Sequence, residues 1–265
     1  MSETETAQST ATPSQLAVIE MEDVTVGALR DQSTSVVENV HWKVQGGEYW
    51  VIGGLQGSGK SDFLMMTGSL MAPIKGRYRF FGEPMPIFEE ARLGLRLRLG
   101  LVFDNGQLFN HLTVSENIAL PLRYHRNLSK AQIEPEVQKI LEALDLAEWA
   151  DSTPGAIGRN WQKRVGLARA LAVKPEVLLL DAPLTGLDLR HVTWWLGMLD
   201  QLSRGHPLLQ DRPLTLILTA ADLRPWRGRA RQFAVLRNKE FVVLGTWEKV
   251  EAANRELVQE LLMTQ

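Results

Sequence analysis

The chain has 265 residues, of which 45% are hydrophobic and 23% are charged, and its formal net charge is −2. This composition is typical of a globular protein with one large or two small domains, and it gives no electrostatic basis for binding nucleic acid or an anionic membrane. The absence of cysteine excludes disulfides, thiolate metal sites and cysteine nucleophiles. No apolar run approaches the ~20 residues that a membrane-spanning helix needs, so a membrane role requires a partner.

The first half of the chain predicts strands around one glycine-rich loop. Residues 1–15 are acidic, are rich in serine and threonine, and lack the regions of a signal peptide, so we expect a disordered tail. A helix over 61–70 follows the glycine-rich loop. Apolar alternation and short apolar runs predict strands over 17–26, 35–44, 49–54, 76–81 and 99–103.

The pattern becomes helical over 105–171 and then returns to strands. Three helices are expected: one from Ser115 that Pro121 interrupts, one over 133–149 with Ser129 as its cap, and one over 162–171. Strands follow over 177–181, 214–219, 232–237 and 241–244, and a helix over 247–263. This order predicts an α/β nucleotide-binding core over 16–104 and 172–247, an inserted helical subdomain over 105–171, and a C-terminal helix over 248–265.

Residues 54–61 form a complete G-x-x-x-x-G-K-[ST] phosphate-binding loop between a predicted strand and a predicted helix. Backbone N–H groups of such a loop converge on phosphate oxygens, and the helix adds its positive end. Lys60 would reach the β- and γ-phosphates, and the Ser61 hydroxyl would ligate Mg²⁺. We therefore predict that ATP and Mg²⁺ bind at Gly54, Leu55, Gln56, Gly57, Ser58, Gly59, Lys60, Ser61 and Asp62.

Asp62 has two interpretations, and the sequence leaves both open. Its carboxylate lies where the α-phosphate is expected, so it would repel nucleotide at short range. An acid in the first turn of a helix also stabilises that helix by about 0.3–1 kcal/mol through the helix dipole. Both effects can operate together, so Asp62 is expected to stabilise the empty loop and to weaken ATP binding.

These features resemble the ABC-transporter ATPase family along residues 18–246. The phosphate loop, the acidic strand 177–181 and the run 164–171 carry the resemblance, and the run 99–125 is most similar to the subgroup that serves lipid-trafficking (Mla-type) transporters. The resemblance implies an α/β P-loop NTPase core of ABC type with an antiparallel β subdomain and an inserted helical subdomain. It also implies transmembrane permease subunits as partners, a second ATPase subunit that is identical or homologous, and a peripheral position on the cytoplasmic face of the membrane.

Matched position by position, the chain departs from the family pattern at the residues that carry hydrolysis. Asp104 stands where the family has a glutamine that contacts Mg²⁺ and the attacking water beside the transmembrane docking groove. Ala182 stands where the family has the catalytic glutamate, and Ala220 where it has a histidine that contacts the γ-phosphate. Loss of a general base typically removes about 10²–10⁴-fold in rate. Ser61, Asp181 and Asp104 remain as candidate Mg²⁺ ligands.

The family's signature sequence LSGGQ is also altered, since Ile157, Gly158, Arg159, Asn160 and Trp161 occupy its positions. Either the Arg159 side chain contacts the partner's phosphate, or the segment is simply a helix start with Asn160 as cap and Trp161 packed locally; we favour the second interpretation. Asp188 matches the family's dimer-contact loop and is expected to meet the partner subunit. No aromatic residue that could stack on adenine is evident over 24–29.

Three functions follow from these observations, and we favour the first. The chain is a nucleotide-binding subunit with weak or absent hydrolysis in a dimer docked on membrane subunits; or a structural or regulatory pseudoenzyme dimer that braces a membrane complex without using ATP; or an ATPase that uses unfamiliar residues. Outside this site, we expect His191 and His206 at solvated positions. The run Arg224, Arg227, Arg229 and Arg231 is expected to form a solvated loop, ahead of contact with a phospholipid head group or an acidic partner.

Overall fold

The computed structural model describes residues 17–85, 90–126, 128–253, 258 and 261–262. The predicted tail over 1–15 lies outside these residues. The described strands form one curled sheet in the order β5-β4-β1-β2-β10-β9-β3-β8-β7-β6. Their bounds are β1 Ile19–Ala28, β2 Asp31–Val44, β3 Tyr49–Gly53, β4 Lys75–Phe80, β5 Glu83–Pro84, β6 Leu99–Val102, β7 Val177–Leu180, β8 Thr215–Ala220, β9 Gln232–Arg237 and β10 Glu240–Gly245.

The sheet has an antiparallel part and a parallel part. β1 pairs with β2 and β4 in antiparallel register, and β4 pairs with β5. β3, β6, β7, β8 and β9 run parallel to their neighbours in that group. The two parts join where β10 pairs with β2 at Glu240 and Glu38. The sequence prediction of an α/β core with an antiparallel β subdomain is thus confirmed.

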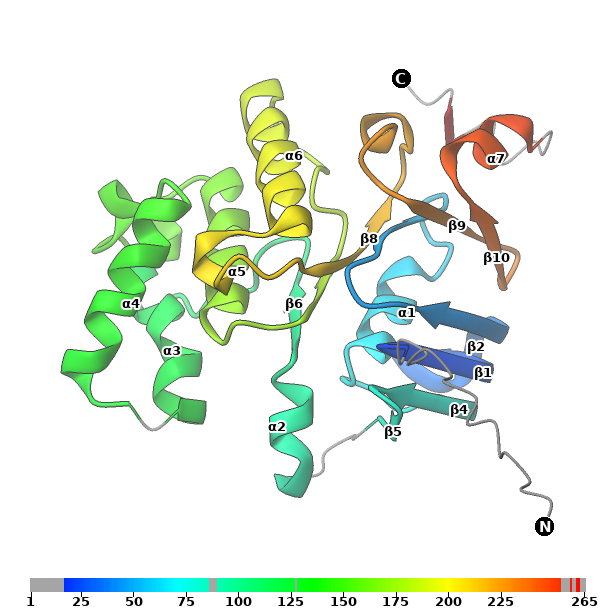
Figure 1. The fold of residues 1–265 in the computed structure, drawn as a ribbon, viewed down its shortest axis with the longest axis horizontal. Coiled ribbons are helices and arrows are strands. Elements are labelled where there is room, and N and C mark those ends of the chain that lie inside the picture. Colours follow the sequence, from blue (N-terminus) through cyan, green and yellow to red (C-terminus); the bar gives the residue numbers. More distant parts are fainter. Residues whose placement is uncertain (1–16, 86–89, 127, 254–257, 259–260, 263–265) are drawn as a thin grey trace, which may run out of the picture.

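The helices are α1 Lys60–Thr67, α2 Leu93–Arg96, α3 Val114–Arg126, α4 Lys130–Ala143, α5 Arg159–Ala172, α6 Leu189–Arg204 and α7 Trp247–Ala252. Short 3₁₀ turns lie at Glu90–Arg92, Ala147–Trp149, Pro154–Ala156, Pro207–Leu209 and Arg224–Trp226. Figure 1 shows α3, α4 and α5 gathered on one side, away from the antiparallel strands β1, β2 and β4. In the described part of the chain, none of the helices has the length and apolarity to span a bilayer.

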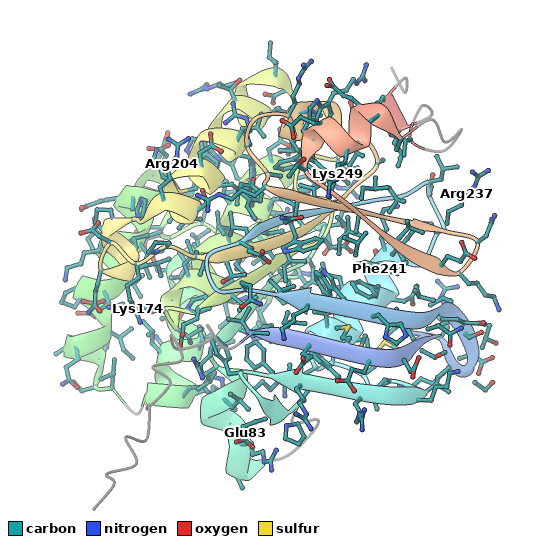
Figure 2. The ribbon with its side chains drawn as sticks, turned by 45° about the vertical axis from the view of Figure 1, so that its right-hand side comes forward. Glu83, Lys174, Arg204, Arg237, Phe241 and Lys249 are labelled. Carbon is teal, nitrogen blue, oxygen red and sulfur yellow. The ribbon has the colours of Figure 1, made fainter. Side chains whose placement is uncertain are left out.

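Two hydrophobic clusters cover the two faces of the sheet, and β3 contributes to both. Tyr49 and Val51 belong to the cluster under the helices α3 to α6, whereas Trp50 and Ile52 belong to the cluster with α1 and the antiparallel strands. In the second cluster, Phe63 of α1 stacks on Phe241 of β10 at 5.0 Å between ring centroids. Figure 2 labels Phe241 on the strand that lies beside β2. β3 is thus buried on both faces, as expected of a central parallel strand, and the phosphate loop follows directly from it.

Three helix predictions need correction. Pro121 lies inside α3 and does not interrupt it, because the loss of one backbone hydrogen bond is offset by the burial of neighbouring Ile118 and Leu122. The helix expected over 133–149 ends at Ala143, since Asp145 takes a left-handed conformation with φ 55°. The terminal helix is interrupted at Ala253, although residues 258, 261 and 262 are again helical. Ser129 does begin α4, with its N–H donated to the Gln132 side chain at 3.0 Å.

Candidate functional site

The phosphate-binding loop leaves the carboxyl end of β3, in the middle of the parallel strands. β3 pairs with β8 on one side and β9 on the other, so that Gly53 lies opposite Ala220 and Val235. Gly57 and Gly59 have φ angles of 79° and 88°, which favour glycine. A Cβ at Gly54 would lie 2.5 Å from the Ser58 hydroxyl and 2.9 Å from the Leu236 carbonyl. Gly57 and Gly59 are therefore required by their backbone conformation, and Gly54 is required because neighbouring atoms leave no room for a side chain.

The loop carries donors of the kind that phosphate oxygens accept. The Lys60 ammonium donates to the carbonyls of Gly54 at 2.6 Å and Leu55 at 2.7 Å. Burial lowers the pKa of Lys60, while the negative charge of Asp181 acts in the opposite direction. The Ser58 hydroxyl is buried and has no hydrogen-bond partner within the described residues. α1 begins after Gly59 without a side-chain cap. A buried hydroxyl and uncapped helix N–H groups fit a phosphate group.

Asp62 lies in the first turn of α1, as the sequence predicts, but its carboxylate has a specific partner. The N–H of Leu29 donates to Asp62 Oδ1 at 2.7 Å. Leu29 lies between β1 and β2, so this hydrogen bond ties their connection to the helix that follows the phosphate loop. Asp62 therefore joins two segments beside the loop, a role that neither sequence interpretation anticipated.

Asp181 follows β7 at the same carboxyl edge as the phosphate loop. It is buried, and the Thr219 hydroxyl donates to its Oδ1 at 2.7 Å. The same Thr219 oxygen accepts the N–H of Ala182 at 2.9 Å. Because Thr219 is buried in β8, it fixes the orientation of the carboxylate. Because β3 and β7 both run parallel to β8, the residues that follow them, Lys60 and Asp181, lie at the same end of the sheet.

The two alanines that replace catalytic residues lie at this same edge. Ala220 is the last residue of β8 and pairs in register with Gly53, directly before the phosphate loop. Ala182 has a left-handed φ of 43°, and both its N–H and its carbonyl are hydrogen bonded. The positions identified from the sequence are thus brought together, and they present methyl groups where the family resemblance implies a carboxylate and an imidazole.

Lys163 of α5 is a residue of this region that sequence reasoning missed. Its side chain is 8% exposed, and its ammonium lies 2.8 Å from Asp104 Oδ1. It also donates to the carbonyls of Thr185 at 2.7 Å and Ala182 at 3.2 Å. One buried ammonium thus connects α5 with the segments that follow β6 and β7. The sequence feature that could have identified Lys163 is Asp104, an acidic residue for which no basic partner was predicted.

The altered signature segment is the start of α5. Gly158 is the cap residue and is extended, with ψ 157°, whereas Asn160 is already helical; the prediction of Asn160 as cap is therefore wrong. Asn160 instead donates to Asp188 Oδ2 at 3.0 Å and lies 3.3 Å from His191 Nδ1. Trp161 packs against Trp149, with 5.7 Å between ring centroids, so local packing of this tryptophan is confirmed. Ile157 is buried and Arg159 is exposed.

Asp188 caps α6 and pairs with a histidine on the same helix. Its Oδ1 accepts the His191 N–H at 3.0 Å, and its Oδ2 lies 2.7 Å from His191 Nδ1. The hydrogen bond from the His191 N–H is the main cause that lowers the pKa of Asp188. The His191 side chain is only 12% exposed, and His206 is buried, so the predicted solvated positions of both histidines are wrong.

A second surface, which we call the aromatic groove, is a cavity of about 510 Å³ lined by residues of β6, α3 and α5. Phe109 and Tyr124 line it and are 48% and 80% exposed. Arg169 of α5 also lines it and donates to the carbonyls of Gly106 and Gln107, each at 2.9 Å. These bonds fix the segment that follows Asp104. Clustered exposed aromatic side chains mark interaction surfaces.

Residues 37–185 match the sequence profile of the protein family described as ABC transporter. The methionine import ATP-binding protein MetN 2 of Paraburkholderia xenovorans is 32% identical over 97% of this chain and 66% of its own length. The Fe(3+) ions import ATP-binding protein FbpC of Fusobacterium nucleatum is 34% identical over 58% of this chain and 40% of its own length. The chain thus spans between two fifths and two thirds of the length of these relatives.

Two solved structures share the fold. The ATP-binding cassette MJ0796, in a dimeric post-hydrolysis state bound to ADP and Pi, superposes with a TM-score of 0.73 at 25% identity, over 84% of this chain and 95% of that one. The cbiO1 protein of Clostridium perfringens, part of the ABC transporter complex cbiONQ, gives a TM-score of 0.75 at 22% identity, over 89% and 91%. The expected α/β fold of ABC type is therefore confirmed.

Proposed function

Because this chain belongs to the ABC transporter family of ATP-binding proteins, we propose that it is a nucleotide-binding subunit that holds ATP and hydrolyses it weakly or not at all. The observation that carries this proposal is the composition of one sheet edge. Lys60 and Asp181 remain at the phosphate loop, but Ala182 and Ala220 present methyl groups beside them. A methyl group cannot take a proton from water and cannot donate a hydrogen bond to phosphate.

The phosphate cradle supports binding of the nucleotide. Ser58 offers an unpaired buried hydroxyl, and α1 offers uncapped N–H groups. The Lys60 ammonium, which donates to the carbonyls of Gly54 and Leu55, would donate to phosphate oxygens instead if ATP were bound. Mg²⁺, when bound, would neutralise charge on the phosphates, and Ser61 and Asp181 are the residues that would hold it.

Asp104 fits the metal less well than the sequence predicts. Its carboxylate already pairs with the Lys163 ammonium at 2.8 Å, and ligation of Mg²⁺ would have to compete with that pair. Within the described residues, no three carboxylate or histidine side chains are close enough to form a metal site of their own. We therefore propose that the Asp104–Lys163 pair is structural, and that the metal depends on ATP, Ser61 and Asp181.

The aromatic groove is the surface that we propose for the permease partner. Phe109 and Tyr124 supply apolar contact area, while Arg96, His125 and Arg169 line the same cavity and favour an acidic residue on the partner. The Arg169 hydrogen bonds join the groove to the segment after Asp104, which supports a link between docking and the Asp104–Lys163 pair. A second ATPase subunit, contacted through Asp188, and a peripheral position on the cytoplasmic face of the membrane complete the proposal.

The cargo is proposed from the relatives. Their names describe import of methionine and of Fe(3+) ions, which favours an importer. The similarity of residues 99–125 to the Mla-type subgroup favours a lipid transporter instead. Isolation of the intact complex distinguishes the two, since the substrate-binding and membrane subunits that co-purify identify the transporter class. The double variant Phe109→Ala/Tyr124→Ala should lose the membrane subunits, whereas Ile74→Ala, which changes an exposed apolar residue just before β4, should retain them.

A second candidate function is a dimer that braces a membrane complex without ATP. The Lys60 hydrogen bonds favour it, because they satisfy the ammonium without a phosphate. Titration of the full chain with ATP–Mg²⁺, with Lys60→Ala as control, separates the two functions. Saturable binding that Lys60→Ala removes supports a nucleotide-binding subunit. A stable dimer that binds no nucleotide supports the function of bracing a membrane complex.

A further inference from the structure

A cavity that the nucleotide site does not explain lies at the edge of the sheet opposite the phosphate loop. Its volume is about 730 Å³, and Tyr49, the first residue of β3, lines it, whereas the phosphate loop follows the last residue of β3. The rest of the lining comes from the end of α6, the segment 227–231 and α7. Figure 2 labels Arg204 and Lys249 on α6 and α7, the two helices that contribute to it. The cavity is therefore separate from the nucleotide site.

Ion pairs account for only part of the positive charge in this lining. Arg227 lies 3.1 Å from Glu251, and Arg229 pairs with Asp200. The remaining acid, Glu248, keeps its negative charge, since a hydrogen bond from the neutral Thr246 side chain is the main cause that lowers its pKa. Two of the three acids of the lining are thus ion-paired, and its four arginines exceed its three acids by one positive charge.

Two arginine side chains of the lining, those of Arg204 and Arg231, are left over. Both are exposed, and neither side chain has an ion pair or hydrogen bond within the part of the chain that the structure describes. Two guanidinium groups without an ion-pair partner in a lining of net positive charge can bind an anion, and arginine binds carboxylate and phosphate with paired hydrogen bonds. The predicted solvated loop over 224–231 is thus mostly ion-paired, with Arg231 as the exception.

A second cavity of about 590 Å³ adjoins the first and gives the site an apolar half. Arg204 and Arg231 line both cavities. The second lining also includes Phe81, which is partly exposed, and Pro213, which is exposed. A ligand with its charge between the two arginines therefore has apolar surface available on one side.

Tyr49 adds a polar group to the floor of the first cavity. Its hydroxyl is buried and has no hydrogen-bond partner among the described residues. Burial raises the pKa of Tyr49, and the charges of Asp200 and Arg229 act on the same hydroxyl. Proteins rarely leave a buried hydroxyl unpaired, so a bound water or ligand oxygen is expected to complete this hydrogen bond.

We propose that the two cavities form one binding site for a small organic anion. Its carboxylate or phosphate group pairs with Arg204 and Arg231, and its apolar portion lies along Phe81 and Pro213. The site lies at the edge of the sheet away from the phosphate loop, so its ligand is distinct from the nucleotide. Binding at this site does not depend on the proposed function.

Calorimetric titration of the full chain tests this site with probes that separate charge from apolar area. Octyl phosphate and octanoate, each below its critical micelle concentration, should bind with one-to-one stoichiometry and about tenfold or more tighter than inorganic phosphate or uncharged octyl glucoside. Arg204→Gln and Arg231→Gln should each weaken octyl phosphate binding by about tenfold or more, because each removes charge-assisted hydrogen bonds. Arg237→Gln, at the other end of β9, is the matched control and should leave binding unchanged.

Four outcomes overturn the proposal: no binding of either anion, equal binding of octyl glucoside, equal weakening by Arg237→Gln, or loss of binding in Lys60→Ala. The last result would place the anion at the phosphate loop. Circular dichroism and thermal unfolding of each variant confirm that it is folded.

Sedimentation with phosphatidic acid vesicles then identifies the source of the anion. Capture that needs Arg204 indicates a lipid head group, and octyl phosphate binding without capture indicates a free metabolite.

Discussion

Replacing the buried Lys163 by methionine removes the ammonium that joins α5 to the segments after β6 and β7. The change leaves the carbonyls of Thr185 and Ala182 without their donor and leaves Asp104 without its cation. Hydrogen bonds to charged groups contribute about 1.5–3 kcal/mol each, and breaking a fully buried ion pair costs about 3–5 kcal/mol. Asp104 is 54% exposed, so water replaces part of the lost contact. We expect the free energy of unfolding to fall by about 2–4 kcal/mol.

Urea unfolding of the full chain, followed by circular dichroism, measures this loss. Lys174→Met is the matched control, because Lys174 pairs with Glu136 at 3.2 Å in a more exposed setting, and its loss should cost about 1 kcal/mol or less. The Asp104→Asn variant and the double variant complete a cycle that isolates the pair, with an expected coupling of about 0.5–2 kcal/mol. A Lys163→Met protein within about 0.5 kcal/mol of wild type would refute the proposed structural role.

Three further predictions concern the nucleotide site and its surroundings. Replacing Ala182 by glutamate and Ala220 by histidine together should not restore phosphate release, because the altered signature segment remains in a homodimer; turnover like that of an active relative would contradict this. Asp62→Ser should tighten ATP binding about fivefold in calorimetry, since it removes about 1 kcal/mol of repulsion, and weaker binding would show that the Leu29 hydrogen bond matters more. Hydrogen bonds lower the pKa of Asp188 below its ordinary value of 3.8, so its stabilising contribution is present above pH 3.8 and is lost as the pH falls through the lowered pKa. Asp188→Asn should therefore be less stable than wild type in urea at pH 7 and match it in strong acid; an equal difference at both pH values would contradict the assignment.

Local patterns in the sequence predicted the elements that hold the candidate site. β3, the phosphate loop and α1 follow from an apolar run, required glycines and an adjacent helical segment, because each signal is contained within a few residues. The strand that ends at Asp181 follows from a short apolar run for the same reason. Pro121 shows the limit of such patterns, since packing of α3 against its neighbours outweighs a local helix breaker.

Contacts between distant segments could not be predicted from one sequence. Lys163 and Asp104 are far apart in the chain, and only the packing of α5 beside β6 brings them together. In the same way, His191 is mostly covered because Asn160 and Asp188 meet at the junction of α5 and α6. Asp62 has a neighbour in Leu29 only because the turn between β1 and β2 lies beside α1. Each of these depends on tertiary structure rather than on periodicity.

The central claim is that this chain still holds ATP at the loop over 54–61. Calorimetric titration of the full chain with ATP–Mg²⁺ tests it most directly, with Lys60→Ala measured in parallel. We predict saturable binding with a dissociation constant below about 1 mM, lost in the Lys60→Ala variant. Absence of binding below that concentration, or binding that Lys60→Ala leaves unchanged, would contradict the claim.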